Sequence, residues 1–167
     1  MSDFHELAGS VLDKARDRKL TLATAESCTA GALATLLADA PGAGGVFHGG
    51  FVVYSKQQKR AVLGVPHDVL ARSTAVSQPV AEAMARGVLE RCPADIAVAI
   101  TGVAGPESDE DGNPIGLMHV AVAARGSSIL HRKYEFGEDT RGGLRVRVMK
   151  EALHLLEEVL DSVWVSP

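Results

Sequence analysis

Three neighbouring side chains that can act as nucleophiles, Ser27, Cys28 and Thr29, come directly after a short segment with the composition of a β-strand. That segment is residues 21–26, and the leucines of residues 33–37 then follow helical spacing. The start of a helix presents free N–H donors and a partial positive charge to whatever binds there. The sequence therefore predicts a strand, a helix beginning at Thr29 and, between them, either a nucleophilic site or a helix capped by one of the two hydroxyl groups.

Amide hydrolysis needs a nucleophile, a base to take its proton, donors for the oxyanion and a proton for the departing ammonia. A lysine can be that base only when it is neutral, so its pKa must lie well below the usual value of about 10.4. Burial and neighbouring cations lower a lysine pKa, and Arg141 and Arg145 are candidate cations. The backbone N–H groups of Cys28 and Thr29 are candidate oxyanion donors. Spacing alone does not show which lysine meets Ser27.

Cys28 is an alternative nucleophile, because thiolates attack more readily than alcohols and a helix start lowers the pKa of a thiol. A cysteine enzyme also needs a histidine base, and the six histidines of the chain lie in no diagnostic context. His48, beside Gly49 and Gly50, is the one histidine that we retain as a candidate site residue. We expect Cys28 to pack in the core or to donate its N–H group.

A second loop with suitable chemistry follows residues 95–101, a nearly unbroken apolar run typical of a central strand. Its sequence is Thr-Gly-Val-Ala-Gly-Pro at residues 101–106. Gly102 and Gly105 allow backbone amides to approach a ligand closely, and Thr101 offers a hydroxyl group. A plain turn at the end of the strand is the alternative interpretation.

The acidic loop at residues 107–113 begins like a calcium-binding loop. The twelfth position is Met118 instead of the bidentate glutamate, and the flanking segments are predicted strands instead of helices. We therefore predict no metal site here, and we expect a mobile acidic loop that covers the site.

Four motifs together resemble the CinA C-terminal domain family, the nicotinamide-nucleotide amidohydrolases. Glu-Ser-Cys-Thr-Ala-Gly at residues 26–31 is similar to the family signature Glu-Ser-Cys-Thr-Gly-Gly, and residues 54–59 match Tyr-Ser-x-x-x-Lys. Residues 101–106 resemble Thr-Gly-Ile-Ala-Gly-Pro, and residues 137–145 resemble Gly-Asp-Arg-x-x-Val-Arg. The signature departs at Ala30, where the family usually has glycine. We expect the methyl group there to be tolerated if φ is negative, and to narrow the pocket.

The resemblance implies deamidation of nicotinamide mononucleotide to nicotinate mononucleotide and ammonia, in pyridine-nucleotide recycling and without a metal or cofactor. It implies Ser27 as the nucleophile, Lys59 as its base and Tyr54 as a supporting hydroxyl, with the N–H groups of Cys28 and Thr29 as the oxyanion site. The nucleotide-binding residues that it implies are Thr101, Gly102, Gly105, Arg141 and Arg145.

The family also implies a homodimer. In the family this domain often follows a second, nucleotide-processing domain, and we expect this chain to be the stand-alone form. A non-catalytic nucleotide-binding or regulatory module, connected with competence or DNA damage, is the alternative function. Ser27 and Lys59 discriminate between the two, since a binding module can lose either side chain without consequence.

The remaining sequence predicts one domain over residues 1–167 with an α/β fold, a three-layer α/β/α sandwich on a mixed β-sheet. Helices are predicted over 3–18, 29–39, 56–64, 67–72, 77–91 and 139–161, a buried strand over 50–54, and an antiparallel hairpin of strands over 116–125 and 128–136.

Composition narrows the partners to small molecules. With 46% apolar residues and no run of about 18 apolar residues, the chain predicts a globular protein without a membrane partner. The net charge of −4 provides no surface that would follow the phosphates of a nucleic acid. No signal peptide is recognisable, and the two cysteines lack metal-ligand spacing, so we expect a cytoplasmic protein with free thiols.

Overall fold

The computed structural model describes residues 2–162 and contains a mixed five-stranded sheet. The strands are β1 (Leu22–Glu26), β2 (Phe47–Val52), β3 (Ile96–Gly102), β4 (Leu117–Ala124) and β5 (Leu130–Glu135), in the spatial order β2-β1-β3-β4-β5. β2, β1 and β3 run parallel, whereas β4 and β5 form the antiparallel hairpin predicted from the sequence.

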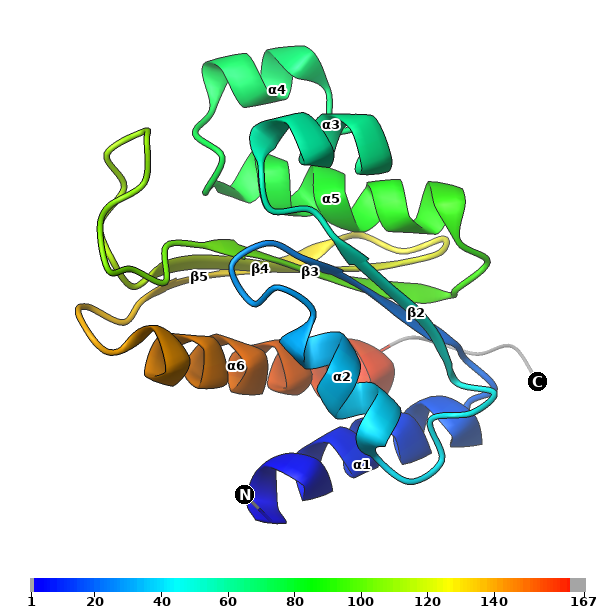
Figure 1. The fold of residues 1–167 in the computed structure, drawn as a ribbon. Helices are drawn as coiled ribbons and strands as arrows, with labels where there is room; N and C mark the ends of the chain where they lie inside the picture. Colours follow the sequence, from blue (N-terminus) through cyan, green and yellow to red (C-terminus); the bar gives the residue numbers. More distant parts are fainter. Residues whose placement is uncertain (1, 163–167) are drawn as a thin grey trace.

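Helices cover both faces of the sheet (Figure 1). They are α1 (Ser2–Asp17), α2 (Ala32–Asp39), α3 (Lys56–Leu63), α4 (His67–Arg72), α5 (Gln78–Arg91) and α6 (Arg141–Ser162). Helices α3, α4 and α5 lie on one side, and α1, α2 and α6 lie on the other. The predicted three-layer sandwich is therefore confirmed. None of the helices in residues 2–162 is long and apolar enough to span a bilayer.

The central strand β3 separates two apolar cores, as its unbroken apolar sequence predicts. Ile96, Val98 and Ile100 face the core shared with α1, α2 and α6. The small residues Ala97 and Ala99 face α5, which lets that helix pack close to the sheet. All of β3 except its last residue is buried, because both faces are covered.

The prediction of a buried strand at residues 50–54 was wrong. β2 comprises Phe47–Val52, and its side chains alternate between half-buried and exposed. It lies at the edge of the sheet and pairs with β1 alone, so only one of its two edges has a neighbouring strand. The apolar type of Val52 suggested a core position, but this side chain is 53% exposed.

A pair of stacked histidines links β4 and β5 on the side of the sheet that faces α5. His119 Nδ1 and His131 Nε2 are 2.9 Å apart, and His119 is buried. Burial, assisted by the charges of His131 and Lys133, lowers the pKa of His119 to about 4, and burial also lowers the pKa of His131. Both rings are therefore neutral in the folded protein at pH 7.

We expect this pair to make stability depend on pH below neutrality. As the pH falls, the unfolded chain binds a proton at the ordinary histidine pKa of about 6.5, before folded His119 does. The contribution to the free energy of unfolding is complete above about pH 6.5 and is lost as the pH falls toward 4, by about 2 kcal/mol between pH 7.5 and 5. Urea unfolding at both pH values measures it. His119→Gln should lose distinctly less stability on acidification, and an equal loss would contradict the prediction.

Candidate active site

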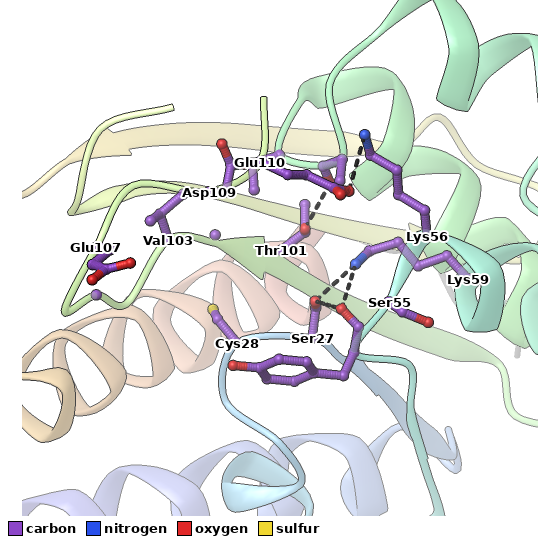
Figure 2. A pocket seen from close by; sticks show the side chains of 15 residues that line it. Ser27, Cys28, Ser55, Lys56, Lys59, Thr101, Val103, Glu107, Asp109 and Glu110 are labelled. Atoms are coloured by element: carbon purple, nitrogen blue, oxygen red, sulfur yellow. Dashed lines mark hydrogen bonds and ion pairs between the residues drawn. The ribbon is translucent and has the colours of Figure 1, made fainter. Parts of the chain in front are cut away.

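A cavity of about 240 Å³ lies where β1 and β3 end (Figure 2). Its lining comes from four segments of the chain, residues 27–28, 54–59, 75–76 and 101–110. The carboxyl ends of neighbouring parallel strands are the usual location of ligand sites in α/β folds, since the loops that follow the strands converge there. The two loops singled out from the sequence therefore meet at one site.

The turn after β1 is longer than predicted. Helix α2 begins at Ala32 and not at Thr29, and Gly31 at its start makes no side-chain cap. Neither Ser27 nor Thr29 therefore caps the helix, so that alternative from the sequence is excluded. Ala30 has φ +52°, so the condition for tolerating its methyl group, a negative φ, is not met. Ala30 is exposed and does not line the cavity.

The buried side chain of Glu26 occupies the N-terminus of α2. One carboxylate oxygen accepts from the N–H groups of Gly31 at 3.1 Å and Leu33 at 3.0 Å, and the other accepts from Ala34 at 2.7 Å. The expectation that these donors are free for a ligand was therefore wrong. The sequence contained a signal, since an acidic residue shortly before a helix can satisfy its first N–H groups.

We expect Ala30→Gly to stabilise the protein. Alanine in the left-handed region costs about 1 kcal/mol relative to glycine, which adopts that region freely. The free energy of unfolding should rise by roughly that amount, which corresponds to an increase of about 2–4 °C in Tm. Thermal and urea unfolding measure the change. The matched variant Ala61→Gly, at an exposed position inside α3, should instead be destabilised. A loss of stability in Ala30→Gly would contradict the strain assigned to this turn.

Lys59 contacts Ser27 inside the cavity. Lys59 Nζ donates a hydrogen bond to Ser27 Oγ at 2.8 Å, and both side chains are buried (Figure 2). The carbonyl oxygen of Tyr54 lies close to both groups, 3.5 Å from Nζ and 3.4 Å from Oγ. Helix α3 places the lysine here, because the hydroxyl of Ser55 accepts from the N–H group of Gln58 and so starts the helix one turn before Lys59.

Burial lowers the pKa of Lys59 to about 8. Cys28 and the carboxylate of Glu110 oppose this change, whereas the charge of Lys56 lowers the pKa further. Arg141 and Arg145, the cations expected from the sequence, are not among the causes, so that expectation was wrong and the assisting cation is Lys56. A lysine with this pKa is partly neutral near neutral pH, which a base must be.

The thiol of Cys28 is buried beside the sulfur of Met118, at 3.7 Å. Burial raises the pKa of this thiol to about 12, because the charged thiolate is disfavoured away from water. The sequence had suggested that a helix start would lower it. That suggestion was wrong, since α2 begins only at Ala32. Cys28 therefore packs in the core, while part of the residue lines the cavity.

The backbone N–H groups of Cys28 and Thr29 donate to no backbone carbonyl oxygen of the described residues. Cys28 lines the cavity, whereas Thr29 is buried and does not belong to the lining. The Thr29 hydroxyl also has no partner within residues 2–162. The turn thus carries spare donor groups next to the Ser27 hydroxyl.

The loop after β3 contributes the opposite wall. Thr101, Gly102 and Gly105 all line the cavity. The hydroxyl of Thr101 donates to the carbonyl oxygen of Ala75 at 2.9 Å, so it holds the segment that leads into α5. A side chain at position 102 would collide with Met118, because an added Cβ would lie 2.0 Å from its sulfur. Gly105 adopts φ +80°, a conformation that glycine favours.

The acidic loop lies over the cavity, as predicted. Glu107, Asp109 and Glu110 contribute to its lining. Lys56 Nζ forms an ion pair with Glu110 at 3.1 Å (Figure 2). It forms a second ion pair with Asp111 at 2.7 Å, and the two contacts attach the loop to α3. Nothing in the sequence indicates this role of Lys56, because the two residues of the pair with Asp111 are 55 positions apart. Within residues 2–162, no three His, Cys, Asp or Glu side chains could together hold a metal ion.

The remaining candidates lie around the site or outside it. Tyr54 lines the cavity and its side chain is 59% exposed. Arg145 Nε donates to the carbonyl oxygen of Cys28 at 2.7 Å. Arg141 is exposed at the start of α6, and neither arginine lines the cavity. His48 lies on the exposed side of β2, also outside the cavity.

Proteins similar to this chain agree on its family. The model of the CinA C-terminal domain matches residues 4–160. A CinA-like protein of Akkermansia muciniphila is 44% identical over 151 residues, which cover 87% of this chain and 36% of that protein. A CinA-like protein of Myxococcus xanthus is 47% identical over 165 residues, covering 99% and 39%. The chain spans about a third of the length of the curated relatives it matches.

Solved structures with the same fold extend over nearly the whole chain. The competence/damage inducible protein CihA from Agrobacterium tumefaciens is 38% identical with a TM-score of 0.90, covering 96% of both chains. A competence-damaged protein (CinA) superfamily protein from Klebsiella pneumoniae is 36% identical with a TM-score of 0.91, covering 96% of this chain and 99% of that one. With a continuous match over residues 4–160, relatives that are 44% identical and a shared fold, this chain belongs to the CinA C-terminal domain family.

Proposed function

We propose that the chain is an amidohydrolase that converts nicotinamide mononucleotide to nicotinate mononucleotide and ammonia, with Ser27 as nucleophile and Lys59 as base. The observation that carries the proposal is the 2.8 Å hydrogen bond between Lys59 Nζ and Ser27 Oγ within a cavity. Burying a lysine without a carboxylate partner is costly, so a functional reason for its position is needed. Membership of the CinA family supports the same reading.

The acylation step uses the groups around Ser27. Neutral Lys59 accepts the Ser27 hydroxyl proton as Oγ attacks the amide carbon and forms a tetrahedral oxyanion. The N–H groups of Cys28 and Thr29, which donate to no backbone carbonyl of the described residues, are the proposed donors to this oxyanion. Lys59 then delivers its proton to the amide nitrogen, the C–N bond breaks, ammonia leaves, and an ester on Ser27 remains.

Deacylation reverses the roles with water as the nucleophile. A water molecule attacks the ester carbon while Lys59 takes its proton. Collapse of the second oxyanion breaks the bond to Ser27 Oγ, and Lys59 returns the proton to that oxygen. The products are the carboxylic acid, which ionises, and the restored Ser27–Lys59 pair. The whole cycle consumes one water and needs no other reactant.

The size of the cavity suggests how the substrate is placed. At about 240 Å³ it is smaller than typical drug-sized ligand sites of about 300–1,000 Å³. We propose that it holds the amide and its ring, and that the rest of the nucleotide lies at the mouth, near the exposed side chain of Tyr54. Thr101, Gly102 and Gly105 line the cavity and remain proposed substrate contacts. Binding of the phosphate by Arg141 and Arg145 stays a prediction.

A nucleotide-binding module without catalysis is the second candidate, since relatives are named competence/damage-inducible proteins. The two readings separate in one experiment. The purified chain is incubated with nicotinamide mononucleotide, and ammonia and nicotinate mononucleotide are measured together. The enzyme proposal expects them in equal amounts. Binding of the nucleotide without any ammonia release would favour the binding module.

A further inference from the structure

An arginine from the last helix holds the peptide next to Ser27. Arg145 Nε donates to the carbonyl oxygen of Cys28 at 2.7 Å, although the two residues are 117 positions apart. Arg145 is half-buried and lies in the first turns of α6, on the same side of the sheet as α2 (Figure 1). A short hydrogen bond from a charged donor is among the stronger contacts in proteins.

The planarity of the peptide gives this contact a consequence for the site. In a trans peptide the C=O and N–H groups point in opposite directions. The carbonyl held by Arg145 belongs to the same peptide as the Thr29 N–H group, so Arg145 fixes the direction of that donor. The neighbouring peptide is fixed in the same way, because the Ser27 carbonyl accepts from the Ala30 N–H group at 3.1 Å and thereby orients the Cys28 N–H group.

The other end of the turn is held by Glu26, whose carboxylate accepts from Gly31, Leu33 and Ala34. Glu26 leaves the peptide between Cys28 and Thr29 untouched, and Arg145 is the side chain that reaches it. The carboxylate of Glu26 at one end and the guanidinium of Arg145 in the middle therefore hold the turn that follows Ser27.

The charge of Arg145 also reaches the site. A guanidinium group stays protonated at all relevant pH values, and a cation at the carbonyl oxygen polarises the whole peptide. The attached N–H group becomes a stronger donor as a result. The charge of Arg145 also acts on the neighbouring thiol, because burial raises the pKa of Cys28 and the charges of Lys59 and Arg145 oppose that rise.

We propose that Arg145 is a positioning residue, which orients and polarises the Cys28–Thr29 peptide so that the turn carrying Ser27 stabilises the oxyanion of the hydrolysis. This inference rests on the proposed function. It assigns Arg145 a task in the transition state that is separate from any contact with the phosphate of the nucleotide.

Kinetics with two substrates separate the two tasks. Nicotinamide mononucleotide and nicotinamide riboside carry the same amide, but only the first has a phosphate. Arg145→Met should lower kcat by about 100-fold for both substrates, with KM changed less than about threefold, since losing an oxyanion donor acts on the transition state. Arg145→Lys, which keeps the charge, should have a kcat about tenfold higher than Arg145→Met and about tenfold lower than the wild type. A higher KM for the phosphorylated substrate alone, with kcat unchanged, would overturn the proposal and make Arg145 a phosphate ligand.

Arg147→Met is the matched control on the same helix. Arg147 contacts Phe136 and Asp139 and does not reach the turn. Its removal should leave kcat within about twofold of the wild-type value. Thermal unfolding of each variant shows whether it is folded. If Arg145→Met does not fold, Arg145→Lys replaces it in the comparison. A kcat of Arg145→Lys equal to that of the wild type would then contradict the positioning role of the planar guanidinium.

A second measurement keeps this test independent of the substrate. Phenylmethanesulfonyl fluoride labels activated serines, and mass spectrometry gives the rate at which Ser27 is modified. If the wild type releases no ammonia from either substrate, the proposed function fails, but the labelling rate still reports on the turn. Labelling should be about tenfold slower in Arg145→Met than in Arg147→Met. Equal labelling rates in the two variants would overturn the positioning role.

Discussion

Ser27→Ala is expected to lower ammonia release from nicotinamide mononucleotide by about three orders of magnitude or more. The hydroxyl is the atom that attacks in the proposed mechanism, and Lys59 donates a hydrogen bond to it at 2.8 Å. Removal of the nucleophile leaves the cavity and the oxyanion donors in place, so the nucleotide should still bind. Ammonia measured in a continuous assay gives kcat, and nucleotide titration gives the affinity.

Cys28→Ala is the matched control for this experiment. The Cys28 thiol is buried against Met118 and burial raises its pKa to about 12, so it should not attack. This variant should keep activity within about tenfold of the wild type, with a stability loss from the missing sulfur contact. The assignment of the nucleophile would be wrong if Ser27→Ala stayed active while Cys28→Ala were inactive. Thermal unfolding of both variants confirms that each is folded.

Lys59→Met is expected to lower ammonia release from nicotinamide mononucleotide as much as Ser27→Ala does, by about three orders of magnitude. Methionine fills the same buried space beside Ser27 but cannot take a proton, so only the base is removed. Lys59→Arg provides the sharper comparison, because arginine keeps a positive charge and cannot act as a base at neutral pH. Both variants should be inactive. Near-normal turnover in Lys59→Arg would show that the position needs a charge and not a base.

The pH dependence of the wild type tests the same residue without a mutation. Burial lowers the pKa of Lys59 to about 8, and the neutral form is the active one. The value of kcat/KM should therefore rise about tenfold per pH unit below pH 8 and level off above it. The rate falls at lower pH because protonated Lys59 cannot accept the proton of Ser27. A flat profile between pH 6 and 9 would contradict a base with this pKa.

Local patterns were enough to predict most of the elements. The apolar run before Thr101 predicted the central strand, and Gly126 and Ser127 predicted the hairpin turn between β4 and β5. These features depend on side-chain periodicity and on turn residues, which act between near neighbours. The edge position of β2 was not predicted, because the place of a strand in the sheet depends on residues that are distant in the sequence. An apolar residue such as Val52 indicates that burial is favourable, but not whether another layer of the fold covers it.

The candidate site depends on relationships that local patterns do not contain. By itself the sequence determined that a strand ends beside Ser27, that Lys59 lies one turn into a helix capped by Ser55, and that glycines follow the central strand. Only the tertiary structure decided that Lys59 meets Ser27, that Lys56 holds the acidic loop and that Arg145 holds the Cys28 carbonyl. The physical reason is the order of the parallel strands: β2 pairs with β1, so the helix after β2 is brought to the end of β1.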